Sequence, residues 1–317
     1  MARAVDRARD LTMAGIVVVG SASGDLVVRH ERPPDIGETV FGSSFHVVPG
    51  GKGLNQAIAA ARAGGSVTFV GAVGDDEYGR LVRDVLEQAG ADTGTLVTLP
   101  GVATGTAHIS VFDGGDNAIV VVPAANAAVS TLDDDARSHI RAADYVLAQF
   151  ERPLELVRDA FEEARATGAR TVLTPAPVLP IDDELLNLVD ILVPNAVEAR
   201  RLAGVDDDER AALDLSRRVG LVVLTQGERG SLLARNGVIE SRTPARLVEV
   251  VDTTAAGDTF VGALAAWLSQ GSALADAIVA ATAAASLCVT SPGASPSIPD
   301  RERIESTLAA DRAEARN

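Results

Sequence analysis

Short runs of β-branched and aliphatic residues alternate along the chain with longer amphipathic segments. Each short run is nearly continuous in apolar side chains, as expected for strands covered on both faces. The longer segments place apolar residues at i, i+3, i+4 and i+7, the spacing of one helix face, as at Leu54, Ala57, Ile58 and Ala61. The predicted strands are Ile16–Val19, Val67–Val70, Tyr145–Ala148, Thr171–Leu173, Ile191–Val193 and Leu221–Thr225, and the predicted helices are the segment after Lys52, Glu77–Ala89, Leu154–Ala166 and Gly257–Leu268.

This alternation predicts an α/β fold with a doubly wound, mostly parallel sheet. Two segments break it: residues 25–48 read as extended, and residues 104–122 read as a hairpin around a turn at 113–117. Together they predict a small antiparallel β lid of four strands over the ligand-binding edge. No Pro/Gly/Ser-rich linker divides the chain, so we expect a single domain over residues 1–317, with an unstructured N-terminal arm and a charged helix after Asp300.

Composition and charge narrow the class of protein. The chain has 317 residues, 47% apolar and 23% charged, with a formal net charge of −16; this fits a globular protein and disfavours a nucleic-acid partner. The longest apolar stretch, residues 277–289, is too short to span a bilayer, and no signal-peptide core follows the N-terminal arm. The single cysteine, Cys288, reads as a buried side chain of a protein from a reducing compartment, so we expect a cytoplasmic location and no membrane partner.

Glycine-rich loops that lead from strands into helices are the places where an α/β sheet binds ligands. The first is Gly50-Gly51-Lys52-Gly53, which lacks the Ser or Thr after lysine of a phosphate-binding loop and the third glycine of a dinucleotide fingerprint. Lys52 and Asn55 lie three positions apart on one edge of the predicted helix, where both can donate to hydroxyl groups. A tight turn at a helix start, without a ligand, explains the glycines equally well.

The second loop, Asp252 to Phe260, contains both a candidate anion site and a candidate proton acceptor. It turns through small residues into a helix, which exposes the amides of Ala255 to Asp258 at the positive end of that helix as an anion site. Asp258 at the same helix start is expected to be ionised and to accept a proton from a substrate hydroxyl. The alternative is that Asp258 or Thr254 is simply an N-cap; the nonapeptide as a whole favours the site.

Two further segments give weaker signals. The loop from Thr225 through Gly227 follows a predicted strand and can line a nucleotide. Asn195 and Glu198 lie three apart at a helix start, where the glutamate is either a capping-box acid, which the pattern favours, or a holder of a metal's water shell. None of the four histidines has metal-ligand spacing to another or to Cys288, which disfavours structural zinc.

At this point the residues resemble the PfkB family of sugar kinases, and within it the ribokinase subfamily. GGKGLNQAIAAARAGG (residues 50–65) is similar to the first family signature, and DTTAAGDTF (252–260) is similar to the second. Further segments follow in the family's order, among them IGETV at 36–40 and VTSPGASPSIP at 289–299, so the resemblance covers about residues 17–299.

The resemblance implies transfer of the ATP γ-phosphoryl group to the primary hydroxyl of a pentose, D-ribose before others, by a homodimer joined through the lid. It also implies roles for matching positions. Asp258 would be the base, and Ala255, Ala256 and Gly257 the anion hole. Glu198 would organise Mg²⁺. The remaining implied positions are Ser23, Asp25, Gly51, Lys52, Asn55 and Glu151 for the sugar, Asn195, Thr225, Gly227, Gly257 and Thr282 for ATP, and Asp252, Thr254, Cys288, Ser291, Gly293 and Ser297 for a monovalent cation, usually K⁺.

One departure bears on the acceptor. Ser23 stands where the subfamily usually carries an asparagine that contacts the sugar, and a shorter side chain with fewer hydrogen bonds can alter hydroxyl selectivity. Deoxyribose, another pentose or a nucleoside therefore remain alternatives to ribose. A non-catalytic sugar-binding regulator is disfavoured because Asp258 and its loop are intact. A dinucleotide-dependent dehydrogenase is disfavoured because Gln56 occupies the place of the third glycine.

Overall fold

The computed structural model describes residues 15–114 and 116–314, so the expected N-terminal arm lies outside the described residues. Its centre is a nine-stranded sheet in the order β13-β12-β11-β10-β9-β8-β1-β4-β5. Neighbours from β5 to β11 run parallel, and β12 and β13 add an antiparallel edge. The strands are β1 (Gly15–Val19), β4 (Ser66–Gly74), β5 (Leu96–Leu99), β8 (Tyr145–Gln149), β9 (Arg170–Thr174), β10 (Ile191–Leu192), β11 (Leu221–Thr225), β12 (Ser231–Arg235) and β13 (Val238–Thr243).

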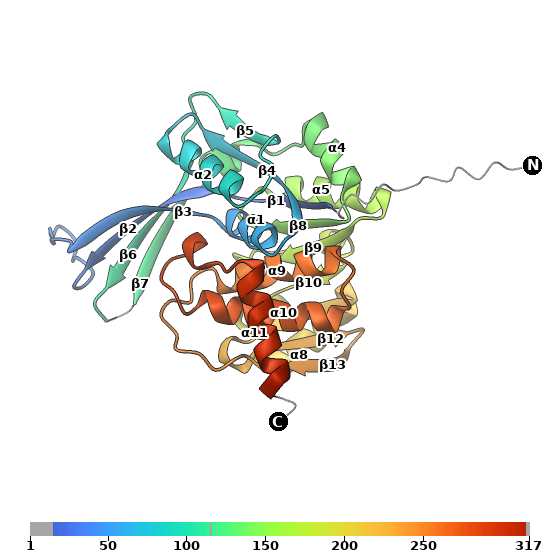
Figure 1. Ribbon diagram of the computed structural model, residues 1–317. Coiled ribbons are helices and arrows are strands. Elements are labelled where there is room, and N and C mark those ends of the chain that lie inside the picture. Colours follow the sequence, from blue (N-terminus) through green and yellow to red (C-terminus); the bar gives the residue numbers. More distant parts are fainter. Residues whose placement is uncertain (1–14, 115, 315–317) are drawn as a thin grey trace, which may run out of the picture.

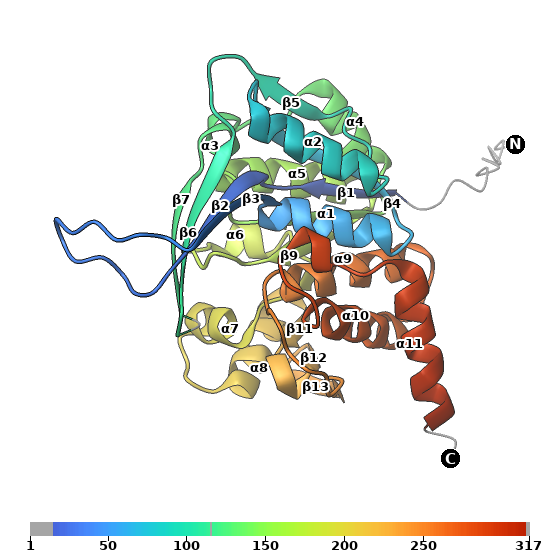
Figure 2. The ribbon, with the colours of Figure 1, turned by 60° about the vertical axis from the view of Figure 1, so that its left-hand side comes forward.

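Helices cover both faces of this sheet, as Figure 2 shows. In β1, Ile16 and Val18 pack into one core and Val17 and Val19 into the other, because successive strand residues point to opposite faces. The first core contains α1 (Lys52–Arg62), α2 (Glu77–Gln88), α9 (Ala256–Ser269), α10 (Leu274–Cys288) and α11 (Arg301–Glu314); the second contains α4 (Asp134–Ala142), α5 (Leu154–Thr167), α6 (Asp183–Leu186), α7 (Ala196–Ala203) and α8 (Asp208–Val219). The doubly wound α/β fold is thereby confirmed.

The lid is a second sheet of four strands that extends away from the main body (Figure 1). Its order is β3-β2-β6-β7, with β2 (Ser23–His30), β3 (Ser44–Gly50), β6 (Gly105–Phe112) and β7 (Asn117–Val122). The segment read as extended forms the antiparallel pair β2–β3, and the predicted hairpin forms the antiparallel pair β6–β7. β2 and β6 pair in parallel, which corrects the expectation of antiparallel pairing throughout. Each hairpin leaves the main body through its first strand, so the two first strands run the same way.

All six predicted strands and four predicted helices are present, as is the charged helix after Asp300, which is α11. Three strands were not predicted: β5, β12 and β13. Short helices complete the chain, namely α3 (Ala125–Ala128) and two 3₁₀ turns, Gly227–Arg229 and Ser295–Ser297. Among the described helices, none combines the length and apolar character needed to cross a bilayer.

Candidate active site

The N-termini of α1 and α9 meet beside the turn after β1, at the carboxyl edge of the main sheet, where α/β proteins bind ligands. The start of α1 packs directly onto the turn after β1, and this contact requires glycine. Gly51 has a φ of +101°, and a side chain on Gly53 would place its Cβ 2.3 Å from the Cα of Gly20. The close approach presents Lys52 and Asn55 to the same space as the start of α9.

Asp258 lies at the first turn of α9 and is 9% exposed. Its Oδ1 accepts a hydrogen bond from Nε2 of Gln56 at 3.0 Å, and its Oδ2 accepts one from Nδ2 of Asn55 at 3.2 Å. Burial raises the pKa of Asp258 above its usual value, against the opposing effect of Lys52 and these two amides. The expectation of an ordinary ionised carboxylate is therefore modified, since a raised pKa makes the carboxylate a better proton acceptor.

The start of α9 has no side-chain cap. Ala255 adopts the left-handed region with a φ of +61°, which is strained for a residue other than glycine. Within the described chain, the amides of Ala255, Gly257 and Asp258 donate to no backbone carbonyl, while that of Ala256 donates to Thr253 at 3.3 Å. The N-terminus of α9 therefore offers unpaired donors and a positive dipole end to an anion.

A second polar cluster faces α1 from the lid base. The Ser21 hydroxyl donates to Oε2 of Glu151 at 2.5 Å, and the Lys52 amide donates to the same oxygen at 3.0 Å. The Ser23 hydroxyl donates to Oδ1 of Asp25 at 2.8 Å. Burial, opposed by Ser23 and assisted by the charge of Glu151, raises the pKa of Asp25 to about 6. Burial alone would lower the pKa of Lys52, but the carboxylates around it outweigh that effect and the pKa is raised.

A cavity of about 530 Å³ opens beside the start of α9. Its size suits a nucleotide-sized ligand, and most of its lining is apolar. It is lined by the predicted nucleotide-side residues Asn195, Thr225, Gly227, Gly257 and Thr282. Phe260 and residues of the 245–250 segment also line it, although nothing in their sequence pattern assigns them to the nucleotide.

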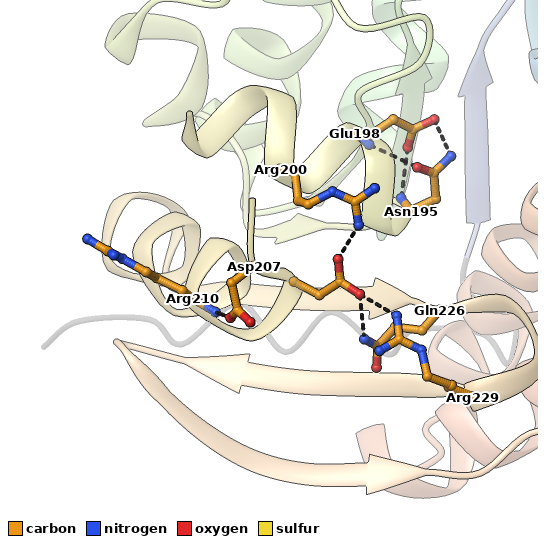
Figure 3. A network of polar contacts seen from close by, with 8 residues as sticks. Asn195, Glu198, Arg200, Asp207, Arg210, Gln226 and Arg229 are labelled. Carbon is orange, nitrogen blue, oxygen red and sulfur yellow. Dashed lines mark hydrogen bonds and ion pairs between the residues drawn. The ribbon is translucent and has the colours of Figure 1, made fainter. Parts of the chain in front are cut away.

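Glu198 is a capping residue of α7. Its two carboxylate oxygens accept from the backbone and side-chain nitrogens of Asn195, both at 2.8 Å, and Asn195 in turn accepts from the Glu198 amide (Figure 3). The capping-box interpretation that the pattern favoured is confirmed. Both oxygens keep further lone pairs, so binding of a metal's water molecules remains compatible with the cap.

A partly buried carboxylate connects the two segments that border this cavity. Asp208, at the start of α8, accepts from Arg200 of α7 and from Arg229 and Gln226 of the loop after β11. The Arg229 guanidinium, more than the other two groups, holds the pKa of Asp208 below its usual range. Asp208 is not among the residues predicted from the sequence, because nothing in its local pattern reveals a contact with a loop about 20 residues away.

The predicted monovalent-cation residues come together as well. Asp252 accepts from the amide and hydroxyl of Thr254 at 2.9 and 2.6 Å and from the Gly293 amide at 2.9 Å. Burial opposes ionisation of Asp252, but these donors outweigh it and lower its pKa. Cys288 Sγ lies 3.0 Å from the Ser297 hydroxyl, and the Ser291 amide donates to the Cys288 carbonyl at 3.3 Å. The result is a charged, oxygen-rich pair of loops, which suits a hard cation such as K⁺.

Comparison with known proteins decides the family. The model of the pfkB family of carbohydrate kinases matches residues 13–301. The chain belongs to this family. Among pfkB relatives, it is 39% identical over 301 residues to the ribokinase of Bacillus subtilis, covering 93% of this chain and 100% of that one. It is 40% identical to the bifunctional ribokinase/ribose-5-phosphate isomerase A of Fructilactobacillus sanfranciscensis, covering 92% of this chain and 56% of that longer relative.

The fold agrees with solved pfkB-type structures. Arabidopsis thaliana ribokinase, solved in complex with ribose and ATP, superposes with a TM-score of 0.89 at 33% identity, covering 94% of this chain and 99% of the other. Thermotoga maritima ribokinase gives a TM-score of 0.86 at 34% identity, with 93% and 99% covered. The main sheet and the lid are both part of a fold that these ribokinases share.

Proposed function

We propose that the protein is an ATP-dependent kinase that phosphorylates the primary hydroxyl of D-ribose to give D-ribose 5-phosphate. The observation that carries the proposal is the position of Asp258, whose carboxylate stands between the unpaired amides of α9 and the polar cluster of Lys52, Asn55 and Glu151. A proton acceptor next to an anion site is what transfer of a phosphoryl group to a hydroxyl requires. The identities of the acceptor, ribose, and of the donor, ATP, are inferred from the ribokinase relatives, one of which was solved in complex with both.

Asp258, the amides of α9 and Lys52 account for the phosphoryl-transfer step. As the sugar oxygen attacks the γ-phosphorus of ATP, its proton passes to Asp258 and the bond from that phosphorus to the bridging oxygen of ADP breaks. The unpaired amides of Ala255 and Gly257 face the charge on the transferred group, and the Ala256 amide would join the anion hole by exchanging its 3.3 Å hydrogen bond to Thr253 for one to the phosphate. Lys52 makes no ion pair within 4 Å among the described residues, so its ammonium is available to the same oxygens.

The sugar is assigned to the space between α1 and the lid base. Asp25 and Glu151 accept from its hydroxyls, and Gly51 leaves room for the ring. Asn55 contributes an Oδ1 that is buried and has no partner among the described groups, so a sugar hydroxyl can satisfy it. Because the Ser23 hydroxyl already donates to Asp25, it orients that carboxylate more than it binds sugar directly.

ATP is assigned to the 530 Å³ cavity, with its base near Thr282 and its phosphates toward Gly257. Asn195, Thr225 and Gly227 line its polar side. Mg²⁺, when bound with ATP, neutralises charge on the phosphate oxygens, and Glu198 would hold it through water because its own oxygens serve the cap.

A monovalent cation, K⁺, is assigned to the two loops at Asp252 and 288–297. Asp252 and Thr254 would hold it from one loop, and Cys288, Ser291, Gly293 and Ser297 from the other, several of them through backbone carbonyls. Its positive charge would lie beside the anion hole. The donor set consists almost entirely of oxygen atoms around one ionised carboxylate, which fits such an ion.

The lid is assigned to a homodimer. Ile119, Val120, Val121 and Val122 on the edge strand β7 are 45–65% exposed, and an apolar edge strand is a liability unless another surface covers it. A second copy of the lid is the matching surface. We further assign the protein to the cytoplasm, consistent with its single, buried and unpaired cysteine.

A second acceptor has one observation in its favour. With Ser23 committed to Asp25, one hydroxyl of ribose lacks the donor that an asparagine would give. A deoxyribose, another pentose or a nucleoside therefore remains the alternative, with the same chemistry at Asp258.

The test is ADP release from Mg-ATP in the presence of K⁺ across D-ribose, 2-deoxyribose, other pentoses, fructose and several nucleosides, with the phosphorylated position read by ³¹P NMR. We expect ribose to have the highest kcat/KM and to yield the 5-phosphate. Preference for another acceptor would reassign the substrate and place the change at Ser23. No transfer to any acceptor would refute the kinase proposal.

A further inference from the structure

A chain of buried amides ends on Asp258. Gln149, the last residue of β8, donates from Nε2 to Oε1 of Gln56 at 2.6 Å, and Gln56 in α1 donates from Nε2 to Oδ1 of Asp258 at 3.0 Å. Both glutamines are fully buried. Three elements that are remote in sequence thus meet in one line of hydrogen bonds.

The direction of this chain is fixed by chemistry. An ionised Asp258 only accepts hydrogen bonds, so Gln56 must turn its NH₂ group toward it and its carbonyl oxygen away. That carbonyl oxygen then faces Gln149, which must present its own NH₂ group. The second proton of the Gln56 amide goes to the Thr174 hydroxyl at 3.2 Å, so every polar position of this amide is used.

This arrangement leaves one polar atom unsatisfied. Oε1 of Gln149 is buried and has no partner among the described groups. Such an atom destabilises the fold, and an apolar residue of similar shape at position 149 would avoid the loss. A glutamine that is unfavourable for folding but aligned with the proposed base indicates a functional constraint.

We propose that Gln149 and Gln56 are positioning residues that hold Oδ1 of Asp258, so that the proton goes to the remaining lone pair of Oδ2, which also accepts from Asn55. The proposal rests on the function proposed above for Asp258. Gln149 acts only through Gln56, since it has no hydrogen bond to the carboxylate itself. Neither residue contacts sugar or nucleotide in this account, so both affect the chemical step and not substrate binding.

The experiment is a double-mutant cycle of Gln56→Met and Gln149→Met, with kcat and both KM values measured for ribose and ATP. We expect kcat to fall by about 100-fold for Gln56→Met, because a misplaced base loses the reactive geometry, and by about tenfold for Gln149→Met. We expect both KM values to stay within about twofold of wild type. In the double variant, loss of Gln149 should add nothing, because its effect passes through Gln56.

Thr171→Val on β9 is the control for loss of a buried polar group, since Thr171 bonds to the Leu188 carbonyl and Asp190 and to no member of this chain of amides. If Gln149→Met does not fold, Thr174→Val tests the same amide, with an expected fall in kcat of a few-fold. Additive effects of the two glutamine substitutions, or losses confined to KM, would overturn the positioning proposal.

Asp258→Asn distinguishes failure of the positioning proposal from failure of the proposed base. If Asp258→Asn has no turnover while both glutamine variants have normal kcat, the positioning proposal is wrong and the proposed function stands. If Asp258→Asn turns over normally, the proposed base is wrong, and the positioning proposal falls with it.

Discussion

Asp25→Asn is expected to stabilise the protein and to weaken sugar binding at the same time. The carboxyl group of Asp25 lies beside Glu151 in a partly buried cluster, and its pKa is raised from 3.8 to about 6, chiefly by burial. An asparagine keeps the size of the side chain and an oxygen that can accept from Ser23, but it carries no charge. The substitution therefore removes the electrostatic penalty and leaves the packing.

The size of the effect follows from the pKa. A rise from 3.8 to about 6 corresponds to about 3 kcal/mol of lost stability in the ionised state, and because Asp25 is only partly buried we expect about 2 kcal/mol. The folded protein binds this proton more tightly than the unfolded chain, so the penalty is absent below pH 3.8 and complete above pH 6. The stability gained by Asp25→Asn should therefore grow from about pH 4 to pH 7.

The assay is urea unfolding of wild type and Asp25→Asn at several pH values between 4 and 8, with ribose affinity by calorimetry at each. Asp113→Asn, at an exposed carboxyl of the lid turn, is the matched control for loss of one carboxylate, and its stability should stay within about 0.5 kcal/mol of wild type. Ribose affinity of Asp25→Asn should fall by about 30-fold at pH 7.5, because a charged acceptor of hydroxyl protons is lost. In wild type, affinity should fall as the pH drops below 6.

Two results would refute this reasoning. A stability difference that is the same at pH 4 and pH 8 would mean that Asp25 is not desolvated in the folded protein. Unchanged ribose affinity would mean that the sugar does not contact Asp25.

Other parts of the molecule give three further predictions. Asp208→Asn should raise the KM for ATP about tenfold and leave the KM for ribose unchanged, because it releases the two segments that border the nucleotide cavity. Asp214→Asn on the same helix is the control, and a KM for ATP equal to that of wild type in Asp208→Asn would contradict the prediction. Replacing K⁺ by tetramethylammonium at equal ionic strength should lower kcat. The same kcat in both salts would refute the proposed monovalent-cation site. Val121→Lys should shift the protein to monomer by light scattering, whereas Val238→Lys on the other sheet's edge should not; an unchanged dimer would exclude the lid interface.

Much of the fold followed from local patterns in the sequence. The strand at 16–19 is continuous in aliphatic residues because both of its faces are covered, and the 252–258 loop is recognisable because small residues and an aspartate stand where a helix begins. β5, β12 and β13 escaped prediction, since their patterns are short and partly polar. The parallel β2–β6 pairing depends on how two distant hairpins leave the main body, which no local pattern encodes.

The residues of the candidate site were likewise only partly predictable from the sequence. Asp258 and Lys52 stand in recognisable loops, whereas Gln56 and Gln149 matter only because α1, β8 and α9 meet in space. In the sequence, Gln56 stands out only because it occupies the place of the third glycine of a dinucleotide fingerprint. Its role is visible only once the partners of its amide are known.

The central claim is that Asp258 takes the proton of the sugar hydroxyl during transfer from ATP. Its most direct test is ribose-dependent ADP formation by Asp258→Asn at saturating Mg-ATP and ribose, together with calorimetric affinities for both. The account predicts turnover at least 1,000-fold below wild type, of the order that general-base catalysis supplies, with both affinities within a few-fold of wild type. Turnover within tenfold of wild type, in a variant that binds both substrates, would contradict it.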